Sequence, residues 1–252
     1  MIKFFRNIRR NLLGEDKTAK YFKYAIGEIL LVMVGILLAL QVNNWNEKRL
    51  AKITEIQLLK QLKNDLKANT NDLKFNQRLH RAKENAINTL LEHMESDLPY
   101  HDSLELSLAS AFIWSKFTRN EGAYQTIKSE GVDIISNLEL RNEVFKLYEG
   151  QLYWLQQFEQ TIVDYVENFR QNKAQDYFKK LNVFTIDSIG SPRRGNAIPI
   201  DYEVLRKDSS FKMHLDALRS DNRLMLYNWV KNYYDRTMTT IDMIDAELKV
   251  LE

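Results

Sequence analysis

The sequence contains no cysteine among its 252 residues. This absence excludes disulfides, thiolate metal sites and thiol catalysis. Proline and glycine are also scarce, at 3 and 8 residues, so the chain has few turn signals for its length. Such a composition favours long helices with short connections over a sheet of many strands. A content of 44% hydrophobic and 28% charged residues is that of a folded protein and not of a disordered one.

Motifs of known chemistry are missing as well. The sequence has no G-x-S-x-G, no P-loop and no dinucleotide-binding fingerprint. No two of its four histidines lie one helical turn apart; they are His80, His93, His101 and His214. We therefore expect no catalytic residue, no metal ligand and no cofactor, and we interpret the protein as non-enzymatic. Basic residues form no stripe or recognition motif in the mildly acidic main part of the chain, so we expect no nucleic-acid partner.

One long apolar run is present near the N-terminus. Residues 29–40 are all apolar, and the stretch 25–42 reaches about the shortest length at which a helix spans a bilayer. Aromatic residues flank this stretch as an interfacial belt would, namely Tyr21, Phe22, Tyr24 and Trp45. A buried core helix or a cleaved signal peptide could also be this apolar, but no small-residue cleavage site follows the run. The sequence therefore predicts a single-pass transmembrane helix, 25–42, retained as a signal anchor.

Basic residues before this helix predict its orientation. Residues 1–24 form an arm with seven basic and two acidic side chains, which favours a cytoplasmic N-terminus and a C-terminal domain on the other side. Within the arm, apolar residues recur at helical spacing opposite four basic ones, which are Lys3, Arg6, Arg9 and Arg10. This pattern is typical of a short amphipathic helix lying on an anionic membrane surface. The alternative is a positive flank with no separate role.

Three residues of the predicted span share one helical face. Steps of seven and eleven residues place Gly35 and Ala39 each within about 20° of Glu28 on a helix. Gly35 and Ala39 form a small-xxx-small pair, which permits close approach of another helix, and Glu28 adds a polar group. We predict a helix–helix contact here. Alternatively, Glu28 lies at the level of the lipid headgroups.

The remaining residues, 43–252, predict a helical domain. A stalk helix is expected over 43–97, with polar residues interrupting its apolar seam at Asn69, Asn76, His80 and Lys83. A bundle is expected over 102–252, with an irregular loop at 182–201 that holds at most one short strand. Its helices are predicted by caps and spacing to run from Asp102 through Phe117, from Thr118 to about Gly131, from Leu138 towards Leu181, briefly after Asp201, from Asp208 to about Arg219, and from about Asp221 to the end. The predicted fold is all-α: one transmembrane helix continuing into an elongated antiparallel bundle.

Aromatic residues recur along two of these helices, among them Trp154, Phe158 and Tyr233. They could line a ligand pocket, although packing in the core is the favoured interpretation.

The sequence also resembles a known family. The stretches YAIGEI (Tyr24–Ile29) and GILLALQVNNWNE (Gly35–Glu47) are similar to the opening of an uncharacterised family of single-pass proteins from Bacteroidota, a domain of unknown function. The stretches YQTIKSEG (Tyr124–Gly131) and NLELR (Asn137–Arg141) resemble its second recurrent block. This resemblance implies an inner-membrane protein with a periplasmic domain, and it brings no activity and no catalytic residue.

Two functions remain open from the sequence. The favoured one is a membrane-anchored scaffold or accessory subunit that acts through self-association or a membrane-protein partner, with the lipid bilayer as its other partner. The alternative is a periplasmic ligand-sensing module that signals through the span to a separate protein.

Overall fold

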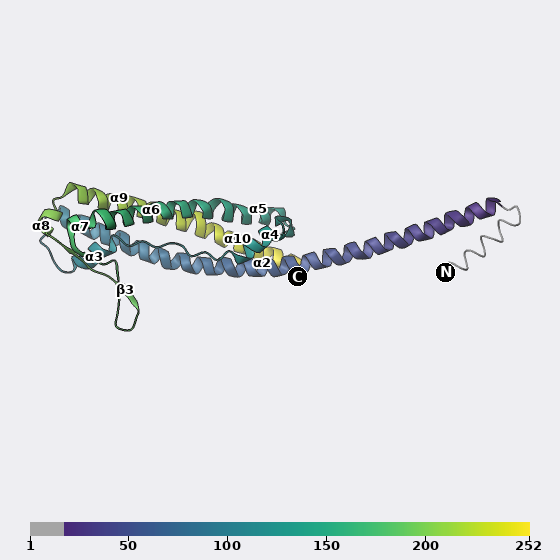
Figure 1. Cartoon of the computed structure of the whole chain (residues 1–252), viewed down its shortest axis with the longest axis horizontal. Coiled ribbons are helices and arrows are strands. Elements are labelled where there is room, and N and C mark those ends of the chain that lie inside the picture. The colour runs from purple at the N-terminus through teal and green to yellow at the C-terminus, as the bar shows by residue number, and fades with distance from the viewer. Residues whose placement is uncertain (1–17) are drawn as a thin grey trace. The chain divides into compact units, whose positions relative to one another are not determined.

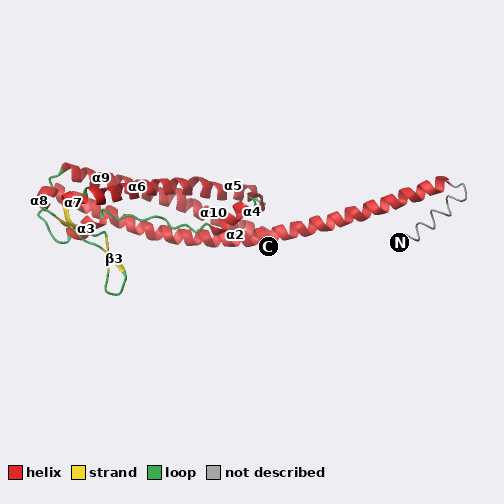
Figure 2. Ribbon diagram, viewed as in Figure 1, coloured by secondary structure: helices red, strands yellow, loops and turns green. Residues whose placement is uncertain are grey.

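The computed structural model describes residues 18–252, apart from the side chains of residues 18–21, 23, 24, 192 and 230. The chain divides into two units, Met1–Thr54 and Glu55–Glu252, and helix α2 (Thr18–Glu95) belongs to both. The fold is all-α, as the sequence predicts, and its few strands are short (Figure 2).

Three long helical runs build the second unit (Figure 1). One is α2 from Glu55 onwards. The second joins α5 (Leu138–Phe145), η2 (Lys146–Gln151) and α6 (Leu152–Asn172), and the third joins α9 (Ser209–Tyr227), η3 (Asn228–Tyr234) and α10 (Asp235–Leu251). Leucine, isoleucine and aromatic side chains from all three runs form one hydrophobic core, which includes Leu62, Leu152 and Trp229.

The third run corrects one prediction. Separate helices were expected from Asp208 to Arg219 and from Asp221 to the end, but the helical backbone is continuous from Ser209 to Leu251. Asp208 does cap this run, because its side chain accepts hydrogen bonds from the backbone N–H groups of Ser210 and Phe211. No glycine or proline follows in the run, so the cap-like Ser220-Asp221 pair has nothing to break the helix.

An extended stretch replaces a predicted helix. The helix expected from Asp102 through Phe117 ends at Ser110 (α3, Leu104–Ser110), and residues 111–121 are not helical. We call residues 111–121 the return segment. The next helix, α4 (Gly122–Glu130), begins after Glu121 and not at Thr118, and Gly131 ends it as predicted, before a short 3-10 turn, η1 (Val132–Ile134).

The return segment decides the direction of the second run. Along it, successive residues contact earlier and earlier positions of α2 and of α6: Lys83 and Glu167 near its start, Asn69 and Glu159 further on. The segment is therefore antiparallel to both helices, so α2 and α6 run in the same direction. The antiparallel order expected for the bundle holds between the second and third runs, where α5 packs on α10 and α6 packs on α9.

Residues 174–205 form a small appendage of hairpins and short helices. Its elements are α7 (Ala174–Tyr177), β1 (Phe178–Leu181), β2 (Phe184–Ile186), β3 (Pro192–Arg194), β4 (Ala197–Pro199) and α8 (Tyr202–Leu205). Strand β1 pairs with β4 and β2 pairs with β3, both antiparallel. The loop expected at 182–201 thus holds three strands and not at most one. The helix expected to run towards Leu181 ends at Asn172, and β1 occupies its predicted last turn. Gly195 is required between the pairs, since a Cβ there would lie 1.6 Å from the carbonyl oxygen of Asn182.

Candidate functional site

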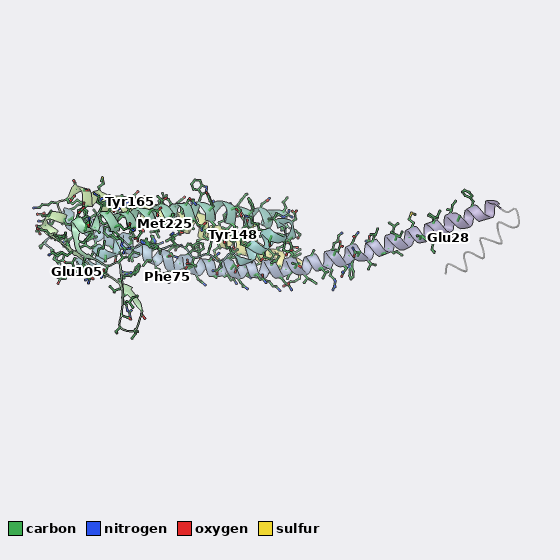
Figure 3. All side chains as sticks on the ribbon, viewed as in Figure 1. Glu28, Phe75, Glu105, Tyr148, Tyr165 and Met225 are labelled. Carbon is green, nitrogen blue, oxygen red and sulfur yellow. The ribbon has the colours of Figure 1, made fainter. Side chains whose placement is uncertain are left out.

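The apolar stretch of α2 is exposed along its length. In the described part of the chain, α2 is the one helix long and apolar enough to cross a membrane, by length and composition, and no residue of its most apolar window is buried. Burial in water-soluble cores normally covers such side chains, so an exposed run of this size marks an interaction surface. Glu28 lies on this helix (Figure 3), and a Cβ added at Gly35 would meet no atom within 4 Å.

The other predicted membrane residues are only partly described. Lys3, Arg6, Arg9 and Arg10 lie outside the described residues. Of the aromatic belt, Tyr21 and Tyr24 fall on α2 without a described side chain, while Phe22 and Trp45 are exposed. The Arg49 guanidinium lies 6.0 Å from the centroid of the Trp45 ring, a cation–π distance.

Polar side chains of α2 bind the backbone of the return segment and of the first turn of α4. Asp72 accepts from the N–H of Thr118 in the return segment, and Asp65 accepts from the N–H of Ala123 in α4, both at 2.9 Å. Between these two, the Asn69 amide accepts from Asn120 N–H at 2.7 Å and donates to Asn120 O at 3.0 Å. We call these contacts, together with those of His80 and Lys83 below, the polar ladder.

Helix α2 and the return segment match in length along this ladder. From Asn69 to Lys83, α2 advances about 21 Å at about 1.5 Å per residue, and an extended chain from Ile113 to Asn120 covers roughly 23 Å. Four side chains of α2 therefore meet a backbone group that no helix or sheet satisfies, namely Asp65, Asn69, Asp72 and Lys83. His80 instead binds the side chains of Ser115 and Asn222. Unpaired backbone groups of this kind are costly when buried, which explains why the seam is polar here.

Two buried titratable side chains end the ladder. Lys83 Nζ donates to Ile113 O at 2.9 Å, and burial lowers its pKa to about 7 against a smaller opposing effect of the Asp221 carboxylate. His80 Nδ1 lies 2.6 Å from Asn222 Oδ1 and its Nε2 lies 3.1 Å from Ser115 Oγ. Burial, followed by the Lys83 charge, lowers the His80 pKa to about 4. The ring is then neutral at pH 7, with Nδ1–H donating to Asn222 and Nε2 accepting from Ser115.

Glu159 of α6 binds the return segment from the other side. Its Oε1 accepts from Phe117 N–H and from Trp229 Nε1–H, both at 3.1 Å. Burial raises its pKa to about 7, although both hydrogen bonds act in the opposite direction. Lys83, His80 and Glu159 are each at most 3% exposed, so a substrate in solvent does not reach them. Their geometry suits a structural role.

Two π-helices contact each other, one on the second helical run and one on the third. They are η2 and η3. π-helices are rare and recur at functional sites, because the extra residue in the turn displaces side chains from their α-helical positions. The sequence indicates neither segment.

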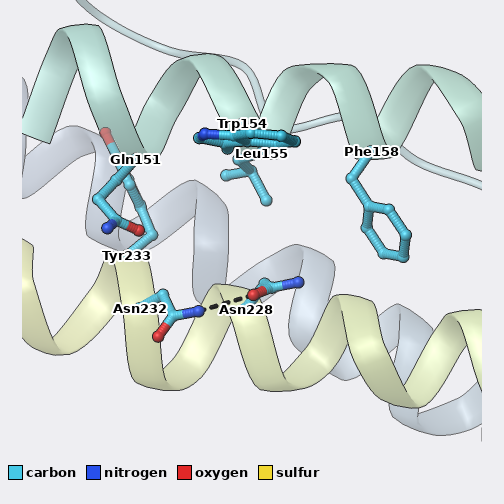
Figure 4. A pocket seen from close by; sticks show the side chains of 7 residues that line it. All are labelled: Gln151, Trp154, Leu155, Phe158, Asn228, Asn232 and Tyr233. Carbon is cyan, nitrogen blue, oxygen red and sulfur yellow. Dashed lines mark hydrogen bonds between the residues drawn. The ribbon is translucent and has the colours of Figure 1, made fainter.

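A pocket of about 250 Å³ opens between these runs (Figure 4). Its walls combine aromatic and amide side chains from η2, α6 and η3; the lining residues are Gln151, Trp154, Leu155, Phe158, Asn228, Asn232 and Tyr233. Trp154 is 73% exposed, whereas Tyr233 is buried. Some members of the aromatic stripe thus pack in the core and others line this pocket.

The inner side of the π-helices carries two buried tyrosines, Tyr148 in η2 and Tyr233 in η3. The hydroxyl group of Tyr148 has no hydrogen-bond partner. Burial raises the pKa of both phenols, and the charge of an ionised Tyr233 raises the pKa of Tyr148 further. Both phenols therefore stay neutral in the core.

Metal binding finds no support in the described residues. Between residues 18 and 252, no three His, Asp or Glu side chains gather in a way that could hold an ion. Of the histidines, His80 belongs to the ladder, and His214 Nδ1 lies 2.7 Å from the hydroxyl of Tyr165.

These features define a helical protein in which α2 carries an exposed stretch long and apolar enough to cross a membrane and then continues into a helical unit with its own core. The chain belongs to DUF6090, a family of unknown function, whose model matches residues 28–189. The matched range begins at Glu28 and includes the apolar stretch, the return segment and η2. Comparisons with curated proteins and with solved structures give no match.

Proposed function

We propose that this protein is a single-pass, membrane-anchored, non-enzymatic scaffold or accessory subunit that acts by self-association or by binding a membrane-protein partner. The observation that carries the proposal is the fully exposed apolar stretch of α2, on a chain whose second unit already has a complete core. Water disfavours such a surface by about 25 cal/mol for each Å² of apolar area. A bilayer removes this cost.

The proposed placement is a bacterial inner membrane, with the N-terminus in the cytoplasm and residues 43–252 in the periplasm. Support comes from the basic residues before the span and from the resemblance to single-pass proteins of Bacteroidota. Lys60→Cys tests the orientation, because Lys60 is an exposed residue of α2 and the chain has no other cysteine. A membrane-impermeant maleimide is expected to label this variant once the outer membrane is permeabilised, while the inner membrane is still intact. Labelling that requires lysis of the inner membrane would reject the orientation.

Contact within the membrane is proposed at the face of Glu28, Gly35 and Ala39. The open space around Gly35 supports close approach of another helix. Cysteines at Gly35 and Ala39 are expected to form disulfide-linked dimers or adducts with a partner. Leu30→Cys and Leu37→Cys are matched controls, since they lie on the opposite face of the same helix. Equal yields on both faces, or no adduct on either, would reject a specific contact.

The pocket between the π-helices favours a second function, ligand sensing. In this proposal, a ligand held between η2 and η3 changes the contact made by the apolar stretch. Asn232→Trp tests the coupling without knowledge of the ligand, because the indole would fill the pocket. The expected result is a changed disulfide yield at Gly35→Cys. An unchanged yield would remove the sensing function and leave the scaffold function intact.

A further inference from the structure

The pocket between η2 and η3 carries enough chemistry to indicate what it binds. Two rare π-helices lie against each other and supply four of its lining residues: Gln151 from η2 and Asn228, Asn232 and Tyr233 from η3. In an α-helix the residues after each extra position would be rotated by about 100°, so this set of side chains depends on the π geometry.

Aromatic surface forms one part of the pocket. Trp154 is 73% exposed and its ring lies flat along α6, with Phe158 one turn further along the same helix (Figure 4). An indole left this open gives up much of the free energy that burial would provide. Its flat face is available to the apolar face of a ligand.

Uncharged amides form the rest. Asn232 Nδ2 donates to Asn228 Oδ1 at 2.7 Å, which leaves Asn228 Nδ2 as a donor and Asn232 Oδ1 as an acceptor for a ligand. None of the seven lining side chains is charged. A ligand with a net charge would lose hydration here without gaining a counter-charge, and a wholly apolar one would bury the amides unpaired.

Size limits the ligand further. A volume of about 250 Å³ corresponds to roughly eight water molecules at about 30 Å³ each, which is room for one ring with its substituents. The ligand that fits is neutral, has one apolar face, and carries donors and acceptors around its rim. A pyranose ring meets all three requirements, because its C–H groups form a face and its hydroxyl groups form the rim.

We propose that this pocket binds one neutral sugar ring, with its C–H face on the indole of Trp154 and its polar groups on the amides of Asn228 and Asn232. The proposal rests on the ligand-sensing function and names the chemical class of its ligand. A single ring with few contacts binds weakly, so the dissociation constant is expected in the millimolar range.

The test is saturation-transfer NMR on the full-length protein in lipid nanodiscs, which avoids sugar-based detergents. N-acetylglucosamine is the neutral probe, and glucosamine and glucuronate are its cationic and anionic counterparts. The expected result is saturable binding of N-acetylglucosamine, at least ten times tighter than binding of either charged sugar. Trp154→Ala is expected to weaken it at least tenfold. Tyr153→Ala is the matched control, since Tyr153 is the neighbouring exposed aromatic on α6 and does not line the pocket.

A second variant separates recognition from folding. Asn232→Asp keeps the side-chain shape and adds a negative charge, so it is expected to lose N-acetylglucosamine and gain glucosamine. Absence of saturable binding, equal binding of all three sugars, or equal losses in Trp154→Ala and Tyr153→Ala would overturn the proposal. Those results would concern the ligand class alone, because the Asn232→Trp experiment tests sensing without any sugar.

Discussion

Lys83 Nζ donates a hydrogen bond to the carbonyl oxygen of Ile113 at 2.9 Å, at a point where the lysine side chain has no exposed surface. This contact joins α2 to the start of the return segment. Burial favours the neutral form of this amine, and the polar ladder thereby makes the stability of the bundle depend on pH.

Lys83→Met is expected to remove part of this dependence. The pKa of Lys83 is about 7 in the folded protein against 10.5 for an ordinary lysine, so between these pH values the unfolded chain binds the additional proton. The free energy of unfolding should therefore rise with pH from about 7 to 10.5 in the wild type, and rise less in the variant. Urea unfolding at several pH values measures the slope. Lys60→Met, on the exposed side of α2, serves as the control and should keep the wild-type slope.

Glu159→Gln is expected to change the pH dependence of the free energy of unfolding below about pH 7. The pKa of Glu159 is about 7 in the folded protein against 4.5 for an ordinary glutamate, so the folded protein retains a proton that the unfolded chain releases. The contribution of this group to stability is thus largest below 4.5 and declines as pH rises to about 7. Glutamine keeps an oxygen for Phe117 N–H and Trp229 Nε1–H and does not ionise. A decline of the same size in the variant would show that Glu159 is not its source.

Asn69→Ala is expected to lower the free energy of unfolding by about 1–3 kcal/mol. The asparagine satisfies both the N–H and the carbonyl of Asn120, and alanine would leave these groups without their partner. Asn64→Ala is the matched control on the same helix, because Asn64 is exposed, and a change within about 0.5 kcal/mol is expected there. If both variants lose the same stability, the ladder does not hold the return segment.

Two glycine substitutions are expected to have opposite effects on the stability of the protein. Gly150 in η2 has a negative φ and open space around an added Cβ, so Gly150→Ala is expected to stabilise the protein by about 0.5–1 kcal/mol. Gly195→Ala is expected to destabilise the hairpins, since its Cβ would overlap the carbonyl oxygen of Asn182. Thermal unfolding of both variants measures the difference. A destabilised Gly150→Ala would show that the π-helix itself requires glycine.

The helix ends show how far local signals carry. Asn137 and Asp201 cap helices as predicted, because their side chains accept hydrogen bonds from N–H groups two and three residues later. The similar signal at Thr118 has no helix after it, since that residue belongs to the return segment and its N–H binds Asp72 of α2 instead. The start of α4 is capped by Asp65, which lies far away in the sequence. A contact between distant residues has no local pattern.

The polar seam shows the same division. Its residues are visible in the sequence at Asn69, Asn76, His80 and Lys83, and their spacing places them on one side of α2. The role of Asn69 and Lys83 was not visible, because the backbone groups that they bind lie thirty or more residues further along the chain. His80 likewise binds side chains of distant residues, Ser115 and Asn222. The pocket residues were named only as an aromatic stripe, and the amides opposite them had no signal at all.

The sequence by itself determined the helical class, the exposed apolar stretch of α2 with Glu28, Gly35 and Ala39 on one face, and the absence of thiol chemistry. These follow from composition and from the 3.6-residue period, which act within a few turns of the chain. Tertiary structure alone decided the extended return segment, the common direction of α2 and α6, and the two π-helices with their pocket. Each of these depends on which buried polar and apolar groups meet across the core, and the energy of such contacts outweighs the local preference for an α-helix.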